Sequence, residues 1–303
     1  MAPVVTQVLD PVTLGEGPHW HSEDNALYFI SGDDSINKFE PDTGKHVKAK
    51  LETLASFILP VEGKKNHFLI TQGRKVVEIE WSAGEGSPKI LRTITEVDHE
   101  NPKHMFNDGK ADPLGRLFAG TLHSEAKPGS AIPGSLYRID PDGTTTKLET
   151  GIQCSNGMCW DLKEKAFYYI DSFSNAIRRY DYDVATGNIS NLTIAFSLTE
   201  NGLTGCPDGM TIDTDGNLWV AVFWGSNVLK IDPRKKKLLE TIEIPVPQVT
   251  SVTFGGHNLD ILYVTTAGIN YADRGMPDPP SGATYAVTGL SARGLPNLKV
   301  RLI

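Results

Sequence analysis

Six polar residues recur at a nearly constant distance before a short apolar segment, and four of them carry oxygen atoms that suit a metal ion. Each lies 11 to 13 residues before the middle of its apolar segment. Carboxylate and amide oxygens without cysteine or histidine partners favour a hard cation such as Ca²⁺, Mg²⁺ or Mn²⁺. The six residues are Glu16, Ser56, Asn107, Asn156, Asp208 and Ser251.

A turn role is the alternative explanation for these positions. Glu16, Asn156 and Asp208 are each followed by glycine, and such dipeptides are common in turns. A pure turn role gives no reason for glutamate at one copy and asparagine at another. We therefore interpret the two carboxylates and two amides as members of one site, in which only some bind the metal and water fills the remaining positions.

The apolar segments that follow these residues form an internal repeat. Their middle residues are separated by 41, 49, 50, 51 and 44 residues. Each is followed by a second strand-like segment that leads to a turn signal. Six copies at this period match the blade spacing of a β-propeller, in which each blade is a four-stranded sheet. We predict an all-β, six-bladed β-propeller that forms a single domain over residues 1–303. The middle residues are Tyr28, Leu69, Phe118, Tyr168, Trp219 and Tyr263.

A propeller brings the polar residues together. The first strand of each blade lines the central channel and all six first strands start on the same face, so the polar residues should ring one mouth of the channel. Blades three and six carry insertions of about ten residues on that face, at 122–134 and 266–282, and long loops around a scaffolded site usually contact substrate. Glu125, in the first insertion, could reach a bound ligand.

Composition and charge limit the partners. The net charge of −8 disfavours nucleic acid and anionic membranes, and no apolar run reaches the roughly 18 residues typical of a membrane span. No signal peptide is evident, and three cysteines are an odd number, so we expect reduced thiols and a cytoplasmic location. Cys154 and Cys159 are expected to be packing thiols. The expected partner is a small-molecule substrate, and the chain is expected to be a monomer or weak dimer.

Several motifs carry a family resemblance over nearly the whole chain. GEGPHW, FNDGKADPLGRLFAGT, SNGMCWDLKEKAFYYIDS and PDGMTIDTDGNLWVAVF resemble the regucalcin family, also called senescence marker protein or gluconolactonase-like. ASFILPVEG and IPVPQVTSVTFGG are similar to the insect branch, which includes the firefly luciferin-regenerating enzymes. The resemblance implies a six-bladed propeller, one divalent metal ion in the channel mouth and lactone hydrolysis.

The resemblance also assigns roles to single residues. The family's metal ligands correspond to Glu16, Asn156 and Asp208, with Ca²⁺ the expected ion and Zn²⁺, Mn²⁺ or Mg²⁺ as alternatives. Its substrate-contacting positions correspond to Asn107 and Glu125. The resemblance also implies that Asp171 lies behind the metal ligands and supports them.

One position departs from the family pattern. Met105 stands where the family usually has an arginine two residues before Asn107. Charge-assisted hydrogen bonds contribute roughly 1.5–3 kcal/mol each, so we expect weaker binding of a polyhydroxylated lactone. Met105 could instead pack on an aromatic ligand, with Phe173 and Trp224 as neighbours, although both aromatic residues also suit an ordinary core.

The predicted activity is metal-dependent hydrolysis of small lactones. The metal would polarise the lactone carbonyl and acidify water, and Asp208 would act as the catalytic general base. No GxSxG motif is present, and the histidines are expected to be structural. Two alternatives stay open: a non-enzymatic calcium-binding propeller, and an enzyme of the luciferin-regenerating type that acts on an aromatic heterocycle. Either terminal segment, PVVTQVLD or NLKVRLI, could supply the strand that closes the ring.

Overall fold

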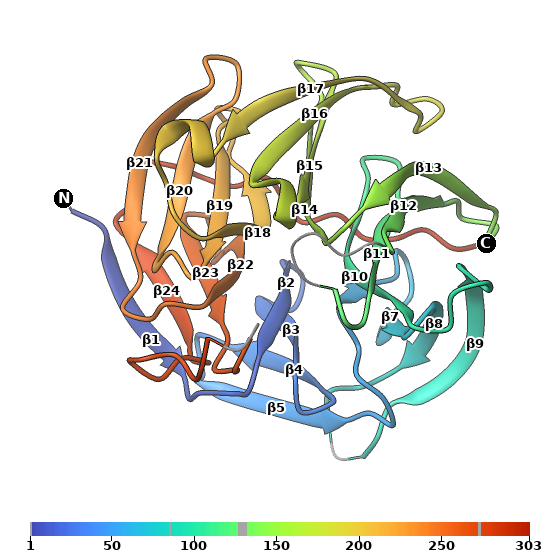
Figure 1. Ribbon diagram of the computed structural model, residues 1–303. Helices are drawn as coiled ribbons and strands as arrows, with labels where there is room; N and C mark the ends of the chain where they lie inside the picture. The colour runs from blue at the N-terminus through green and yellow to red at the C-terminus, as the bar shows by residue number, and fades with distance from the viewer. Residues whose placement is uncertain (1, 85, 127–131, 272–273) are drawn as a thin grey trace.

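Six four-stranded antiparallel sheets are arranged around a central axis (Figure 1). The structure is a computed structural model that describes residues 2–84, 86–126, 132–271 and 274–303. The six-bladed β-propeller predicted from the repeat is therefore confirmed, and each predicted middle residue lies in the second strand of a blade. In the described part of the chain, the helices are short 3₁₀ turns, and none is long and apolar enough to cross a bilayer. These turns are η1 (Ser172–Ser174) and η2 (Thr199–Asn201).

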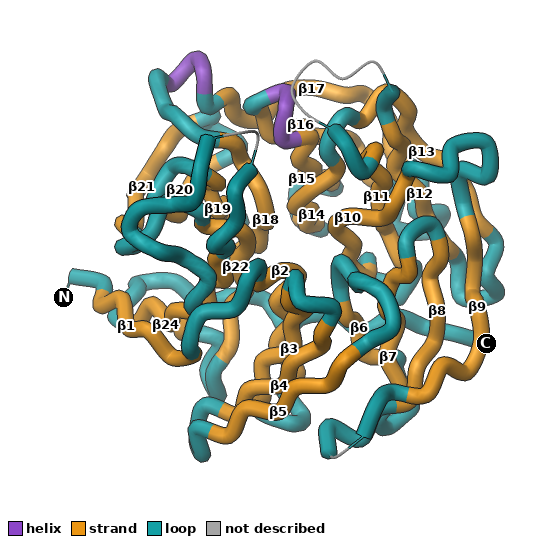
Figure 2. The backbone as a smooth tube through the Cα atoms, turned by 60° about the horizontal axis from the view of Figure 1, so that its bottom comes forward, coloured by secondary structure: helices purple, strands orange, loops and turns teal. Residues whose placement is uncertain are grey.

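The four strands of each blade lie side by side in order from the axis to the rim (Figure 2). The inner strands are β2 (Gly15–His21), β6 (Ile58–Pro60), β10 (His104–Ala111), β14 (Ser155–Asp161), β18 (Cys206–Ile212) and β22 (Val249–Gly255). The second strands are β3 (Ala26–Ser31), β7 (His67–Gln72), β11 (Leu117–His123), β15 (Ala166–Asp171), β19 (Leu218–Phe223) and β23 (Ile261–Thr266). The third strands are β4 (Ser35–Glu40), β8 (Lys75–Glu80), β12 (Gly134–Ile139), β16 (Ala176–Tyr182), β20 (Asn227–Asp232) and β24 (Thr284–Thr288). The outer strands are β5 (Lys45–Lys50), β9 (Lys89–Glu96), β13 (Thr145–Ile152), β17 (Ile189–Ser197), β21 (Lys237–Glu243) and β1 (Val4–Leu9).

The second strands explain why the repeat is visible in the sequence. Strands β3, β15 and β19 are buried along their whole length, because both faces of each blade pack against neighbouring blades. A strand buried on both faces reads as a continuous apolar run instead of an alternating one. One such cluster joins Tyr168 and Ile170 of blade four to Val220 and Leu229 of blade five. The core therefore lies between the blades, and its repeat spacing follows the blade spacing.

The N-terminal segment closes the ring. Strand β1 pairs antiparallel with β24, with Val5 opposite Val287, and supplies the fourth strand of the last blade. The last blade is thereby built from both ends of the chain. This pairing covers the open edge that an unpartnered β24 would present.

The C-terminal segment has a different role, because it runs across the face where the inner strands end. The backbone N–H of Gly294 donates to the Leu259 carbonyl (2.8 Å), that of Val300 to Pro60 (3.0 Å) and that of Ile303 to Pro141 (3.0 Å). These carbonyls belong to blades six, two and three. Residues 293–303 thus connect several blades by backbone hydrogen bonds.

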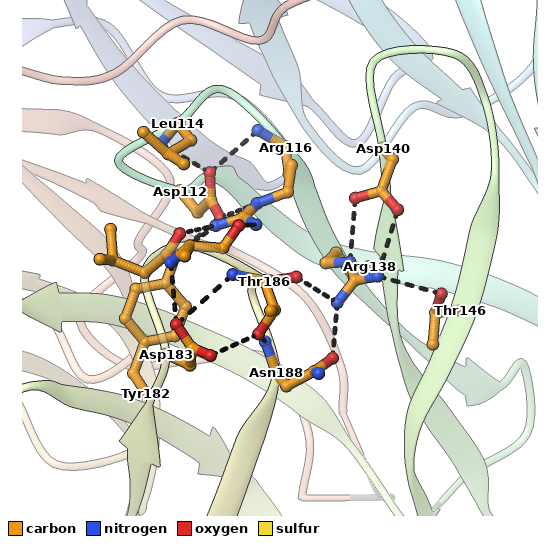
Figure 3. A network of polar contacts seen from close by, with 12 residues as sticks. Asp112, Leu114, Arg116, Arg138, Asp140, Thr146, Tyr182, Asp183, Thr186 and Asn188 are labelled. Carbon is orange, nitrogen blue, oxygen red and sulfur yellow. Dashed lines mark hydrogen bonds and ion pairs between the residues drawn. The ribbon is translucent and has the colours of Figure 1, made fainter.

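A buried polar network joins blade three to blade four (Figure 3). The Asp112 carboxylate accepts hydrogen bonds from the backbone N–H of Arg116 (2.9 Å), from Arg116 Nε (2.6 Å) and from the Tyr182 hydroxyl (2.7 Å). Arg116 Nη2 donates to the Val184 carbonyl at 2.7 Å. Asp112 is fully buried, and its charge is compensated by the guanidinium beside it.

The stretch DTDGNLW (213–219) is a blade corner of the same kind. The Asp213 carboxylate accepts hydrogen bonds from the backbone N–H groups of Asp215 (3.0 Å) and Asn217 (2.8 Å) and from Trp219 Nε1 (3.0 Å). Its oxygens are already used by donors that tighten the turn. This corner therefore has a structural role.

Candidate functional site

Three of the six predicted residues lie within a β-bulge at the start of an inner strand, and Glu16 borders a fourth bulge. The pairing register shifts between Glu16 and His19 in β2, and the same shift in three other blades includes Asn107, Asn156 and Asp208. A bulge adds one residue to one strand and redirects its side chain. The sequence spacing therefore reflects a bulge that recurs from blade to blade.

The glycines that follow Asn156 and Asp208 are needed for strand packing, not for a turn. A Cβ atom on Gly157 would come within 2.5 Å of the Met210 nitrogen, and one on Gly209 within 1.9 Å of Ser251 Oγ. Both glycines lie inside strands. The inner strands of adjacent blades thus approach closely at this level, which holds the preceding polar side chains near one another.

The two serines of the predicted ring do not occupy equivalent positions. In blade six the bulge residue is Thr250, and its hydroxyl donates to the Gly15 carbonyl at 2.6 Å. Ser56 lies before β6, and its backbone N–H donates to Thr71 Oγ1 at 2.7 Å. Blades six and two therefore contribute structural hydroxyls where spacing alone predicted members of the ring.

The two amides of the site are hydrogen-bonded to each other. Asn107 Nδ2 donates to Asn156 Oδ1 (3.0 Å) and to the Ser155 carbonyl (2.7 Å). Asn156 Nδ2 donates to Ser172 Oγ at 2.8 Å. Both amide nitrogens are thus held by protein acceptors, which fixes the orientation of each side chain.

Three carboxylates of the site influence one another. Burial and the charge of Asp108 raise the pKa of Glu16 to about 8. Burial and the charge of Glu16 raise the pKa of Asp208 well above its usual range, and burial raises the pKa of Asp108. Glu16 accepts a hydrogen bond from the Gly17 N–H (2.9 Å), whereas the Asp208 carboxylate has no hydrogen bond or ion pair with any residue that the structure describes. Negative charge here is poorly compensated.

Lys110 is the basic group that acts on these carboxylates. Its charge opposes the rise in the pKa of Glu16 and of Asp108, but burial lowers the pKa of Lys110 itself. Its ammonium group donates to the Met210 carbonyl. Lys110 acts on Glu16 and Asp108 but not on Asp208, so the electrostatic environment favours a further cation.

The donor set fits a hard divalent ion. Glu16 and Asp208 offer carboxylate oxygens, and Asn156 offers an amide oxygen beside them. No group of three His, Cys, Asp or Glu side chains is placed to hold a metal within the described ranges. An ion at this position would therefore depend on the amide oxygen and on water for the rest of its coordination.

Asp171 supports the Asn156 side of the site. Its carboxylate accepts hydrogen bonds from the Cys154 N–H (3.0 Å) and from Arg178 Nη2 (2.9 Å). The neighbouring Ser172 is the acceptor for Asn156. Asp171 is buried and its charge is compensated, so it positions the loop behind Asn156.

The two substrate positions predicted at the loop side are more open. Met105 lies on β10 opposite Leu122 and is partly exposed. Glu125 is exposed, and its carboxylate forms an ion pair with Lys103 at 2.6 Å. The contact that the structure gives for the Glu125 carboxylate is thus with Lys103, and its role toward a substrate stays a prediction. Residues 127–131 of the same insertion lie outside the described residues.

The sequence analysis missed two features of the site. Asp108 is a buried carboxylate next to Asn107, and the NDG motif (107–109) was its only signal. The second feature is the cluster that Phe223 and Tyr271 form with Trp224, of which the sequence indicated Trp224 alone. The centroid of the Phe223 ring lies 5.5 Å from that of Tyr271 and 6.1 Å from that of Trp224, and both contacts are edge-on. Burial and the charges of Cys154, Cys206 and Asp208 raise the pKa of Tyr271, which places this cluster near Asp208.

Trp224 has an unusual backbone conformation. Its φ angle is +60°, in the left-handed region that bulky side chains rarely adopt. Such a conformation costs on the order of 1–3 kcal/mol and is found preferentially at functional sites. The loop between β19 and β20 therefore maintains a strained tryptophan beside the site.

The carboxylates predict a pH dependence for the metal-free protein. Because the pKa of Glu16 is higher in the folded state than its ordinary value of 4.5, the folded state holds this proton more tightly. The contribution of Glu16 to stability is thus complete below about pH 4.5 and is lost as the pH rises towards 8. The loss is at most about 1.4 kcal/mol per pH unit, reduced by the partial exposure of the side chain.

Urea unfolding in chelator at several pH values between 5 and 8 measures this effect. The difference in unfolding free energy between wild type and Glu16→Gln should become less favourable to wild type as the pH rises. His19, whose pKa burial lowers to about 3, acts in the opposite direction below pH 6.5 but is present in both proteins. A difference that stays constant with pH would contradict the assigned electrostatics.

The comparisons with known proteins give a consistent result. A family model described as "SMP-30/Gluconolactonase/LRE-like region" matches residues 14–268. Regucalcin from Danio rerio is 35% identical over 93% of this chain and 93% of its own length. Regucalcin from Homo sapiens is 35% identical over 93% of this chain and 92% of its own length. The solved structure of a luciferin-regenerating enzyme is 40% identical, covers 99% of this chain and 100% of its own, and has a TM-score of 0.96.

Proposed function

This chain belongs to the SMP-30/Gluconolactonase/LRE-like family, and on that basis we propose that it is a divalent-metal-dependent hydrolase of small lactones. The observation that supports the proposal most strongly is the group of poorly compensated carboxylates, Glu16 and Asp208, next to the Asn156 amide. Buried charges of one sign are expensive unless they are neutralised. A divalent cation would neutralise them and leave the pair ionised.

Glu16, Asn156 and Asp208 would hold the metal. Oxygen donors of this kind suit Ca²⁺ best, and Mn²⁺, Mg²⁺ and Zn²⁺ are alternatives. When bound, a divalent ion supplies Lewis acidity, which polarises a carbonyl and lowers the pKa of water. The side chains around the ion would transfer the proton and orient the substrate.

Asp208 is the proposed general base. Its carboxylate has no hydrogen bond to a described residue, so its oxygens are available to take the proton from the attacking water. Water then adds to the lactone carbonyl carbon, the ring C–O bond breaks, and the leaving oxygen takes up a proton to give a hydroxy acid. Asn107 uses both N–H groups on protein acceptors, which leaves its Oδ1 to accept a hydrogen bond from a substrate hydroxyl.

Hydrolysis of a sugar lactone and an aromatic lactone, δ-gluconolactone and dihydrocoumarin, tests this proposal. We expect no turnover in chelator and recovery when Ca²⁺, Mn²⁺, Mg²⁺ or Zn²⁺ is restored. Metal-independent turnover would contradict the mechanism. Binding of metal without turnover of either lactone would instead favour a non-enzymatic calcium-binding propeller.

The aromatic cluster supports a second candidate, turnover of an aromatic heterocycle. Phe223, Trp224 and Tyr271 lie near Asp208, and Met105 replaces the arginine expected from the family pattern. The similarity to a luciferin-regenerating enzyme at 40% identity agrees with such a substrate. Dihydrocoumarin should then be hydrolysed with a higher kcat/KM than δ-gluconolactone.

Met105→Arg tests the basis of that preference. A guanidinium at this position should restore charge-assisted hydrogen bonds worth roughly 1.5–3 kcal/mol, and so raise kcat/KM for δ-gluconolactone by about tenfold or more. The change should appear mainly in KM, with Met105→Leu as the control of similar volume. Equal kcat/KM values for the two variants would show that this position does not contact the sugar.

A further inference from the structure

A cavity lies at the other end of the channel from the carboxylates, where the inner strands end. Its volume is about 660 Å³, within the range of small-molecule sites. Its inner wall comes from the last residues of the inner strands, including Lys110, Cys159 and Thr211. The cavity is therefore a separate space on the opposite face of the propeller.

The C-terminal segment forms one side of this cavity. Residues 295–298 line it, and they are held between the hydrogen bonds of Gly294 to Leu259 and of Val300 to Pro60. Asn297 Oδ1 also accepts a hydrogen bond from Thr253 at 2.9 Å. The backbone of this segment is thus fixed, while its side chains face a hollow.

Apolar side chains dominate the cavity and are not fully packed. Leu295 is 43% exposed and Leu298 is 41% exposed although both belong to an anchored segment. Leu162, across the cavity, is 54% exposed. Trp160 and Leu59 complete the apolar wall. Covering such surface is favourable because it removes apolar area from water, so the cavity suits an apolar ligand.

The polar groups of the cavity favour a ligand that accepts a hydrogen bond. The Lys110 ammonium group has three N–H donors and no acceptor, and it makes one hydrogen bond, to the Met210 carbonyl, among the residues described. The two aspartates of the wall are already occupied. Asp213 accepts from two backbone N–H groups and Trp219, and Asp161 accepts from the Lys163 N–H at 2.9 Å. Among the charged groups of the wall, the unused hydrogen-bonding capacity is thus on the donor side.

We propose that this cavity is a second ligand site, which binds a mainly apolar small molecule with its hydrogen-bond acceptor directed at Lys110. The apolar body would lie between Trp160 and the leucines of the C-terminal segment. A carboxylate or sulfonate is the preferred acceptor because Lys110 is cationic. Binding at this site requires neither the metal nor the lactone, although Lys110 also acts electrostatically on Glu16 and Asp108.

Fluorescence titration with 8-anilinonaphthalene-1-sulfonate in chelator tests the site. We expect saturable binding of one molecule, which excess δ-gluconolactone does not displace. Leu298→Glu should weaken it at least tenfold by placing a charge on the apolar wall. Leu192→Glu, at a leucine 49% exposed on the outer strand β17, is the matched control and should bind as wild type does.

The role of Lys110 is tested with a second probe. Lys110→Met should weaken binding of the sulfonate at least tenfold and leave binding of the neutral N-phenyl-1-naphthylamine within about twofold of wild type. Near-ultraviolet circular dichroism confirms that each variant is folded. Non-saturable binding, or equal losses in Leu298→Glu and Leu192→Glu, would overturn the site. Equal losses of both probes in Lys110→Met would overturn the acceptor assignment.

Discussion

Replacement of Asp208 by asparagine should lower kcat for lactone hydrolysis by about a hundredfold to ten-thousandfold, the usual contribution of a general base. The same change should stabilise the metal-free protein against heat by several degrees. The reason is that burial and the charge of Glu16 raise the pKa of Asp208, so its ionised form is costly without a cation. A neutral amide of the same shape removes that cost. Loss of activity with a gain in metal-free stability distinguishes a functional residue from a structural one.

Lactone hydrolysis with restored metal, and thermal unfolding in chelator, measure the two effects. Asp215→Asn is the matched control, because Asp215 is exposed at a blade corner and should leave both quantities unchanged. Addition of Ca²⁺ should raise the melting temperature of wild type more than that of Asp208→Asn. If Asp208→Asn keeps its activity, or is less stable than wild type in chelator, the assignment of Asp208 is wrong.

Asp112→Ala should cost about 3–5 kcal/mol of unfolding free energy, the usual loss when one partner of a buried ion pair is removed. The alanine would leave the buried Arg116 guanidinium without its carboxylate and the Tyr182 hydroxyl without its acceptor. Urea unfolding in the presence of metal measures the loss. Because this corner joins blades three and four, the whole propeller should unfold at lower urea concentration.

Asp140→Ala is the control for this prediction, since Asp140 pairs with Arg138 in the same region of the structure (Figure 3). That pair is more exposed, and exposed pairs contribute about 0–1 kcal/mol. Similar losses for the two variants would show that the Asp112 network is not the main link between these blades.

The blade repeat could be predicted from sequence because it has a simple physical origin. Second strands such as β15 and β19 are buried on both faces, and burial on both faces gives continuous apolar runs at the blade spacing. Closure of the ring could not be predicted in the same way. Residues 4–9 and 298–303 both combine apolar and polar residues in a strand-like pattern, and only long-range pairing with β24 distinguishes them.

The positions of the bulges were predictable to within about one residue. Counting from the apolar segments identified Asn107 and Asp208 but not Asp108, because a spacing of 11 to 13 residues cannot locate a bulge. The same uncertainty selected Ser251, whereas Thr250 occupies the bulge in blade six. The spacing gives only a number of residues along the chain. The side chain that points toward the channel mouth depends on where the bulge lies in the strand.

The second cavity had no signal in the sequence. It is formed by the ends of inner strands from several blades and by a C-terminal segment that crosses them, so its lining residues are scattered from Leu59 to Leu298. The aromatic cluster near Asp208 is similar, since Tyr271 belongs to an irregular loop with no repeat equivalent. Features built from non-repeating segments require the three-dimensional structure.

The position of a bound metal ion tests the central claim most directly. Crystals grown with Mn²⁺ and measured near its absorption edge would reveal the ion by anomalous scattering. We predict a single strong peak at the channel mouth, within coordination distance of oxygen atoms of Glu16, Asn156 and Asp208. A channel mouth without a peak at saturating Mn²⁺, or a peak held by other residues, would contradict the account.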